Sequence, residues 1–178
     1  MQPLELIYKY YPLENELRNI LFVHSVSVAR KSLDIARNHP ELKLDKTFLS
    51  EAAMLHDIGI FLTYAPKIFC FGTHPYICHG YLGSELLKKE GLPQHALVCE
   101  RHTGAGLSLD QIESRNLPVP YRNMLPLSLE EQVICFADKF FSKSHLNEEK
   151  NVANARKSLL KFGEEGLVRF DHWCELFL

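Results

Sequence analysis

Six side chains that can bind a transition metal occupy positions where the surrounding helical pattern calls for an apolar residue. His24, for example, follows Ile20 by four residues and precedes Val28 by four, so its ring faces inward along an apolar stripe. A buried imidazole needs a partner, and a buried carboxylate is costly unless it is paired or bound to a metal. The set comprises His24, His56, Asp57, His79, His102 and Asp138.

The donor types indicate which metals these residues would bind. Imidazole and carboxylate together suit iron, manganese, cobalt, nickel or zinc, whereas an all-oxygen set would favour magnesium or calcium. Six ligands are more than one tetrahedral zinc requires, and the two oxygens of Asp57 can bridge two ions. We therefore expect two divalent transition-metal ions (Fe, Mn, Co, Ni or Zn), a pair that can activate water and clamp phosphoryl oxygens.

The elements that must position these side chains are helices. Apolar residues recur at three and four positions, which predicts an all-α fold: a single-domain helical bundle over residues 1–178 with long loops. Residues 60–78 form a loop that could lie over a pocket, and the C-terminal helices within residues 150–178 pack on the core. The expected helices cover residues 14–38, 45–59, 80–90, 93–102, 128–141, 150–162 and 165–176, with a short one after Ser108.

Composition narrows the class of protein. The 178 residues are 46% hydrophobic and 24% charged, enough for one sizeable core. A formal charge of −2 offers no broad positive field, so we expect no nucleic acid polymer as partner. The sequence has neither an apolar run of membrane-spanning length nor a leader-like start, which predicts a soluble cytoplasmic protein without membrane contact. A homodimer is left open.

The ligand pattern resembles the HD superfamily of metal-dependent phosphohydrolases. His24, the pair His56-Asp57 and Asp138 match its H…HD…D order, and the sequence His-Asp-Ile-Gly matches its HDIG subgroup. The added His79 and His102 resemble the six-ligand, dinuclear branch. By this resemblance the first four residues hold one ion and the two added histidines hold the second, with Asp57 bridging. It also implies catalytic roles for Asp57, His79 and His102.

One position departs from that family pattern. Many HDIG proteins carry a lysine directly after the motif, where it can meet a phosphate, but this chain has Ile60. The contact is therefore absent or comes from elsewhere, and Lys139, Arg101 and Lys143 are the substitutes in order of preference. We expect Lys139, Arg101 and the loop residue His74 to contact the substrate.

The leading hypothesis is a phosphohydrolase of a small phosphorylated metabolite, most plausibly a nucleotide or dinucleoside polyphosphate. Metal-activated water would attack phosphorus, and a nearby histidine or water would protonate the leaving group. The same ligand order also resembles HD-type diiron oxygenases, which would act on a polyol or a phosphonate. Two further alternatives are a non-catalytic ligand sensor and a set of core histidines bonded to backbone carbonyls.

Overall fold

The computed structural model describes residues 2–146 and 148–178, and within these ranges helices dominate. The helical fold class expected from the sequence is confirmed. The helices are α1 Pro3–Tyr10, α2 Glu16–Asn38, α3 Lys46–Leu55, α4 His79–Lys89, α5 Pro93–Arg101, α6 Leu109–Ser114, α7 Leu129–Asp138, α8 Val152–Leu159 and α9 Glu164–Phe177. Short 3-10 turns are η1 Pro40–Leu42, η2 Ile60–Leu62, η3 Pro66–Ile68, η4 Tyr76–Cys78 and η5 Leu160–Phe162.

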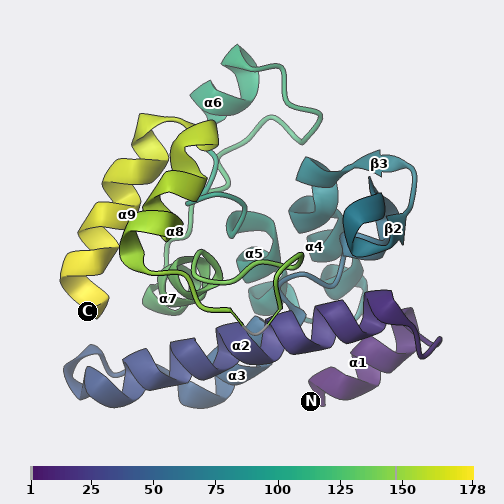
Figure 1. Ribbon diagram of the computed structural model, residues 1–178, viewed down its shortest axis with the longest axis horizontal. Helices are drawn as coiled ribbons and strands as arrows, with labels where there is room; N and C mark the ends of the chain where they lie inside the picture. Colours follow the sequence, from purple (N-terminus) through teal and green to yellow (C-terminus); the bar gives the residue numbers. More distant parts are fainter. Residues whose placement is uncertain (1, 147) are drawn as a thin grey trace.

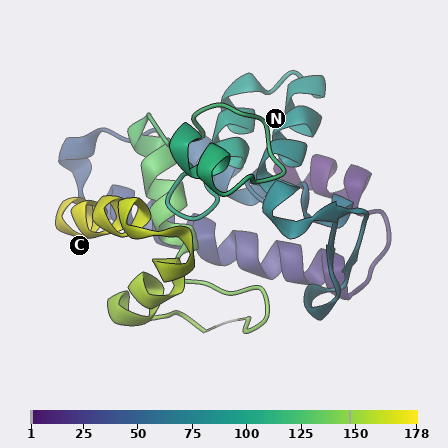
Figure 2. The same ribbon diagram turned by 90° about the horizontal axis from the view of Figure 1, so that it is seen from above.

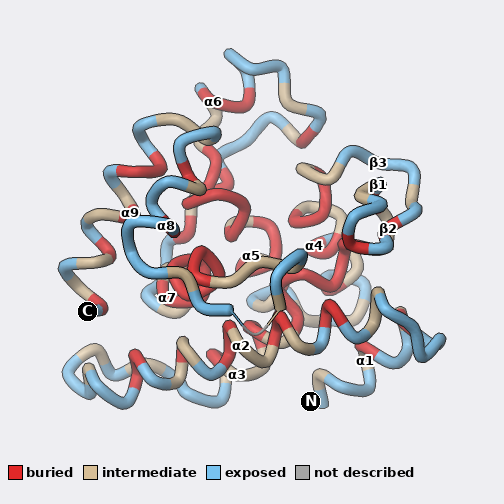
Figure 3. Tube along the Cα trace, viewed as in Figure 1, coloured by how far each residue is buried: buried red, intermediate tan, exposed pale blue. Residues whose placement is uncertain are grey.

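The long helix α2 runs along one side of the molecule and packs against α3 and α7 (Figure 1). Helices α4 and α5 pack against each other beside them. Seen from above, the C-terminal helices lie on one side and the small sheet on the other, with the chain around α6 between them (Figure 2). The buried positions of α2, α4, α5 and α7 face the middle of this arrangement (Figure 3). That interior is where the side chains of the predicted ligands meet.

Helix α2 forms close to where its sequence signals place it. Asn15 caps its N-terminus by accepting a hydrogen bond from the backbone N–H of Arg18, and the helix ends at Asn38, two residues before Pro40. Its buried face includes His24 in line with apolar residues such as Val28, as the spacing predicts. The helix therefore delivers one imidazole to the interior from its middle, where the backbone is most rigid.

Helix α3 ends earlier than the sequence pattern indicates, at Leu55 rather than Gly59. The following residues tighten into turns, with hydrogen bonds from Ile58 N to Leu55 O and from Ile60 N to Asp57 O. The reason is the close approach of α4: a Cβ on Gly59 would stand 2.3 Å from the carbonyl oxygen of His79. The turn places the His56-Asp57 pair at a helix end instead of within a helix.

The segment 60–78, expected as a loop, contains a small three-stranded sheet. Strand β1 (Thr63–Ala65) pairs antiparallel with β2 (Cys70–Phe71) and parallel with β3 (His74–Pro75). The strands are only two or three residues long, because Pro66 and Pro75 interrupt the backbone donors. The sheet ends at η4, which leads directly into the first residue of α4, His79.

The C-terminal pair packs on the remainder of the fold through aromatic side chains. Phe170 of α9 is buried against Phe136 of α7, with ring centroids 5.3 Å apart. Helix α8 packs against α9, and η5 joins the two. Across the described ranges, none of the helices combines the length and the apolar composition that crossing a membrane would demand.

Candidate metal centre

All six predicted ligands converge, each from a different position in the fold. His24 comes from the middle of α2, the His56-Asp57 pair follows α3, His79 begins α4, His102 follows α5 and Asp138 ends α7. Ligand atoms of His24, His56, Asp57 and Asp138 lie within 4.8 Å of one another, and so do those of Asp57, His79 and His102. The structure thus brings all six side chains together at one place, and their role as metal ligands stays a prediction.

Asp57 is common to both groups and divides them between its two oxygens. Its Oδ2 atom lies 3.1 Å from Nε2 of His24 and 3.1 Å from Nε2 of His56. Its Oδ1 atom lies 3.4 Å from Nε2 of His79 and 3.3 Å from Nε2 of His102. Asp138 completes the first group through Oδ1, 2.9 Å from Nε2 of His24. A carboxylate placed in this way can serve two cations at once.

Three of the four imidazoles are oriented by the same local contact. Nδ1 of His56 bonds to the carbonyl oxygen of Ala53 at 2.6 Å, and Nδ1 of His102 bonds to that of Cys99 at 2.7 Å. Nδ1 of His79 bonds to the carbonyl oxygen of Tyr76 at 2.7 Å. In each case the carbonyl lies three residues earlier in the chain, in the last turn of a helix or of a 3-10 turn. Because Nδ1 then donates to a carbonyl oxygen, Nε2 is the ring nitrogen that is left to bind a metal.

Several buried polar atoms at the centre form no hydrogen bond of normal geometry among the described residues, although some of them lie at ion-pair distance from one another or from Lys143. They are Nδ1 and Nε2 of His24, Nε2 of His56 and both carboxylate oxygens of Asp57. Buried acceptors without partners are rare in folded proteins, and a bound cation would satisfy most of this set together. The residues present therefore fit a divalent metal site.

The two carboxylates are held in the ionised form that metal binding requires. Burial by itself would raise the pKa of Asp57, but Lys143 and His56 lower it more, and it lies well below its usual range. Asp138 behaves alike: burial opposes ionisation, while Lys139 and His24 hold the pKa well below the usual range. Both acids are thus anionic at neutral pH.

Two lysines lie against these acids. Nζ of Lys143 is 2.5 Å from Oδ2 of Asp57, and Nζ of Lys139 is 2.6 Å from Oδ2 of Asp138. Lys139 also donates a hydrogen bond to the carbonyl oxygen of His102 at 3.1 Å. Helix α7 ends at Asp138, which lets the Lys139 side chain fold back into the site. Lysines therefore reach this centre from other positions, although the residue directly after the motif is Ile60.

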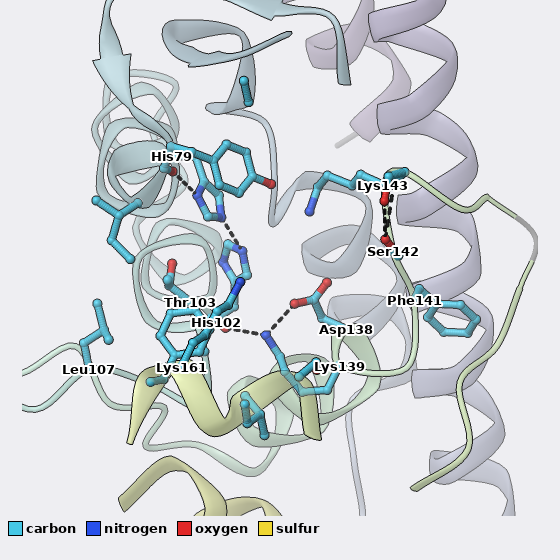
Figure 4. A pocket seen from close by; sticks show the side chains of 18 of the residues that line it. His79, His102, Thr103, Leu107, Asp138, Lys139, Phe141, Ser142, Lys143 and Lys161 are labelled. Atoms are coloured by element: carbon cyan, nitrogen blue, oxygen red, sulfur yellow. Dashed lines mark hydrogen bonds and ion pairs between the residues drawn. The ribbon is translucent and has the colours of Figure 1, made fainter. Parts of the chain in front are cut away.

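The centre opens into a pocket of about 740 Å³ that His79, His102 and Asp138 line (Figure 4). Six of the chain's 20 lysines and arginines line this pocket, against one of its 22 aspartates and glutamates, counted over the described residues. The pocket lining is thus strongly basic, although the net charge of the whole chain is close to zero. The six cations are Lys67, Arg115, Lys139, Lys143, Lys150 and Lys161.

Two residues expected to contact a substrate lie away from the pocket lining. Arg101 pairs with the buried Glu131, with Nη1 2.9 Å from Oε2. His74 is exposed in strand β3. Tyr76, in the turn η4, lines the pocket and stacks on His79 with ring centroids 4.6 Å apart. Sequence reasoning missed the cations of the C-terminal segment, because an isolated lysine between helices resembles any solvated surface lysine.

This fold and site define a metal-binding helical domain. Residues 21–142 match the family model described as HD domain, and the chain belongs to that family. The match covers four of the five helices that carry or adjoin the ligands in full, begins within the fifth, α2, and includes every ligand. The HD domain and the cluster of histidines and aspartates together indicate a metal-dependent enzyme that binds divalent ions.

The chain is similar to curated proteins over part of their length. It is 27% identical to a tRNA (cytidine(56)-2'-O)-methyltransferase of Thermoplasma volcanium over 93% of this chain and 44% of that protein. It is 29% identical to one of Picrophilus torridus over 68% of this chain and 35% of that protein. An uncharacterized protein of Methanocaldococcus jannaschii is 31% identical over 64% of this chain and 60% of its own length. No solved structure matches the chain.

Proposed function

We propose that this protein is a metal-dependent phosphohydrolase acting on a small phosphorylated metabolite, a nucleotide or dinucleoside polyphosphate. The observation that carries this proposal is the opening of the histidine and aspartate cluster into a pocket lined by cations. Cations that line a pocket attract a phosphorylated ligand and hold it against the metal ligands. Phosphoryl transfer depends mainly on such positioning and charge stabilisation.

The residues divide into roles on this proposal. His24, His56, Asp57 and Asp138 would hold one ion, and His79 and His102 the second, with Asp57 shared. When bound, two divalent ions supply a nucleophilic water at neutral pH and neutralise charge on the phosphoryl group. Asp57, His79 and His102 remain the proposed catalytic residues, since the two histidines line the pocket and Asp57 lies directly against both of them.

The lysines of the site would bind the phosphoryl oxygens. Lys143 lines the pocket and is charged at neutral pH: burial would lower its pKa, but Asp57 and Tyr76 raise it above the usual value. It would supply the contact that the residue after the motif, Ile60, does not offer. Lys139 would combine a phosphate contact with the positioning of Asp138 and of the His102 backbone.

The alternative functions require different ligands in the pocket. A diiron oxygenase could use the same ligands, and a phosphonate would suit the same cations, whereas an uncharged polyol would leave them without partners. The relatives named as tRNA methyltransferases share less than half of their length with this chain, so their named reaction is a separate hypothesis. A pocket of about 740 Å³ has the size of a small-ligand site, which favours a small ligand over a nucleic acid polymer.

The test uses purified protein stripped with chelator and reloaded with manganese, iron or cobalt. The panel comprises nucleotides, dinucleoside polyphosphates and p-nitrophenyl phosphate, with the variants Asp57→Asn and, as the matched control, Asp34→Asn. Asp34 carries the same charge but lies on the surface of α2 beside Arg37. We expect metal-dependent turnover that Asp57→Asn lowers by roughly 100-fold or more and Asp34→Asn leaves intact. Absence of turnover with every metal would reject the proposal, and oxygen uptake by the iron form would favour the oxygenase.

A further inference from the structure

One wall of the pocket is built by a segment that follows the part of the chain matching the family. The match ends at residue 142, yet Lys150, Ser158, Leu159, Lys161 and Phe162 also line the pocket. Lys150 lies in the segment leading into α8, Ser158 and Leu159 end α8, and Lys161 and Phe162 lie in the turn η5 that joins α8 to α9. Figure 4 shows the Lys161 side chain on the opposite side of the cavity from Lys143, with His102 between them.

The position of Lys161 at the pocket is fixed through its backbone. Arg115, directly after α6, donates a hydrogen bond from Nη1 to the carbonyl oxygen of Lys161 at 2.9 Å. Gln111 donates from Nε2 to the carbonyl oxygen of Phe162 at 3.0 Å. The next residue, Gly163, has a φ of +97°, and a Cβ there would stand 2.7 Å from Nη2 of Arg115. Glycine thus permits the contact that ties η5 to the rim of the pocket.

The cations of the pocket fall into two groups with different partners: the inner ones, Lys139 and Lys143, lie at the metal centre, and the outer ones, Lys161 and Arg115, lie away from it. Lys139 and Lys143 each face a carboxylate of the metal centre, so their charge is largely balanced. In the described parts of the chain, Lys161 and Arg115 form no salt bridge: Lys161 lies over the Phe162 ring, and Arg115 bonds to a backbone carbonyl. Their positive charge is not balanced by an acid at the pocket. An anionic group of the ligand would balance it.

We propose that Lys161 and Arg115, assisted by Lys150, form a second anion-binding subsite that receives a phosphoryl group other than the one that reacts. This inference rests on the proposed function, in which the first phosphoryl group lies at the metal centre beside Lys139 and Lys143. The substrate class is then a small molecule with at least two phosphoryl groups, such as a nucleoside diphosphate or triphosphate. A phosphate monoester would occupy only the first subsite, at the metal centre beside Lys139 and Lys143.

The test compares the variant Lys161→Ala with Lys157→Ala. Both residues are exposed lysines, so each change removes one charge without creating a cavity, but Lys157 lies on α8 away from the pocket lining. We expect Lys161→Ala to lower kcat/KM for a nucleoside triphosphate by roughly tenfold or more, and that for a nucleoside monophosphate by less than about twofold. Lys157→Ala should change neither. Equal effects of Lys161→Ala on both substrates would overturn the proposal.

A binding measurement separates this inference from the proposed function. The thermal shift of the metal-loaded protein is recorded with adenosine monophosphate and adenosine diphosphate, at an excess of metal ion over nucleotide. We expect the diphosphate to stabilise the protein more than the monophosphate does, and Lys161→Ala to remove that difference. If this occurs without any hydrolysis, the subsite stands and the phosphohydrolase proposal fails. If hydrolysis occurs but Lys161→Ala retains the full difference between the two nucleotides, the subsite is rejected and the phosphohydrolase proposal stands.

Discussion

The Nε2 atoms of His79 and His102 lie 3.0 Å apart although each ring already has a backbone carbonyl at Nδ1. In a neutral imidazole whose Nδ1 donates, Nε2 is an acceptor, so two lone pairs face each other. Burial lowers the pKa of His79 to about 3, and the neighbouring His102 contributes to this, while burial also lowers the pKa of His102. Both rings are thus neutral near pH 7, and a shared cation would relieve the contact between them.

Replacing His102 is expected to remove one metal ion while keeping the other. The variant His102→Ala loses a ligand near Oδ1 of Asp57, whereas the group of His24, His56 and Asp138 near the first ion is unchanged. Metal analysis after equilibrium dialysis should give two ions per chain for the unaltered protein and one for the variant. His172→Ala, on the exposed side of α9, is the control and should retain two. Two ions in His102→Ala would contradict the assignment.

The chelator-treated protein should be most stable near pH 6.5. Below that pH the unfolded chain takes up a proton that folded His79, with its pKa lowered to about 3 by burial, does not accept, so the free energy of unfolding falls. Burial would also lower the pKa of His56, but Asp57 and Asp138 raise it to about 9. Between about pH 6.5 and 9 the folded chain therefore keeps a proton that the unfolded chain releases, and the free energy of unfolding falls again.

Urea unfolding at about pH 5, 6.5 and 9 measures this pH dependence. A steady rise in stability from pH 6.5 to 9 would show that His56 does not carry the proton expected of it. His56→Asn should flatten the decrease on the alkaline side and leave the acidic side unchanged, since the two sides depend on different residues.

Gly59→Ala should destabilise the fold and weaken metal binding together. The added Cβ would meet the carbonyl oxygen of His79 at 2.3 Å and the backbone nitrogen of Gly83 at 2.5 Å, so α4 must shift. We expect a loss of about 3 kcal/mol or more in the free energy of unfolding and weaker binding of the ion beside His79. Gly166→Ala, whose Cβ would approach nothing closer than 3.7 Å, should stay within about 1 kcal/mol of the unaltered protein. Similar values for the two variants would contradict the steric account.

Arg101→Ala should affect stability rather than substrate affinity. Arg101 pairs with Glu131, whose side chain is 8% exposed, and the variant leaves that carboxylate buried without its cation. We expect a loss of about 3 kcal/mol in the free energy of unfolding, with KM of the folded fraction unchanged. Chemical denaturation and steady-state kinetics on the same preparation measure both quantities. A raised KM with unaltered stability would return Arg101 to the substrate contacts predicted from the sequence.

The sequence by itself predicted the candidate ligands and the helices that bring them together. A histidine or aspartate on an apolar stripe is energetically conspicuous, so His24 and Asp138 could be identified from spacing alone. The order of these residues, with the sequence His-Asp-Ile-Gly, indicated that the site is a metal centre. The ends of α3 and α7 were predicted less well, because the helix pattern continues past the residues where tertiary contacts, such as that between Gly59 and α4, force a turn.

Only the tertiary structure decided which cations face the metal centre. Lys143 comes from an irregular segment, and Lys161 lies in the turn η5 beyond the end of α8, so neither direction follows from a helical pattern. Arg101, on a helix close to His102, was predicted to meet the substrate but pairs with Glu131. The physical reason is that a buried ligand must satisfy its polar atoms locally, which leaves a signal in the sequence. A solvated lysine pays no such cost, so its role depends on which distant segments fold beside it.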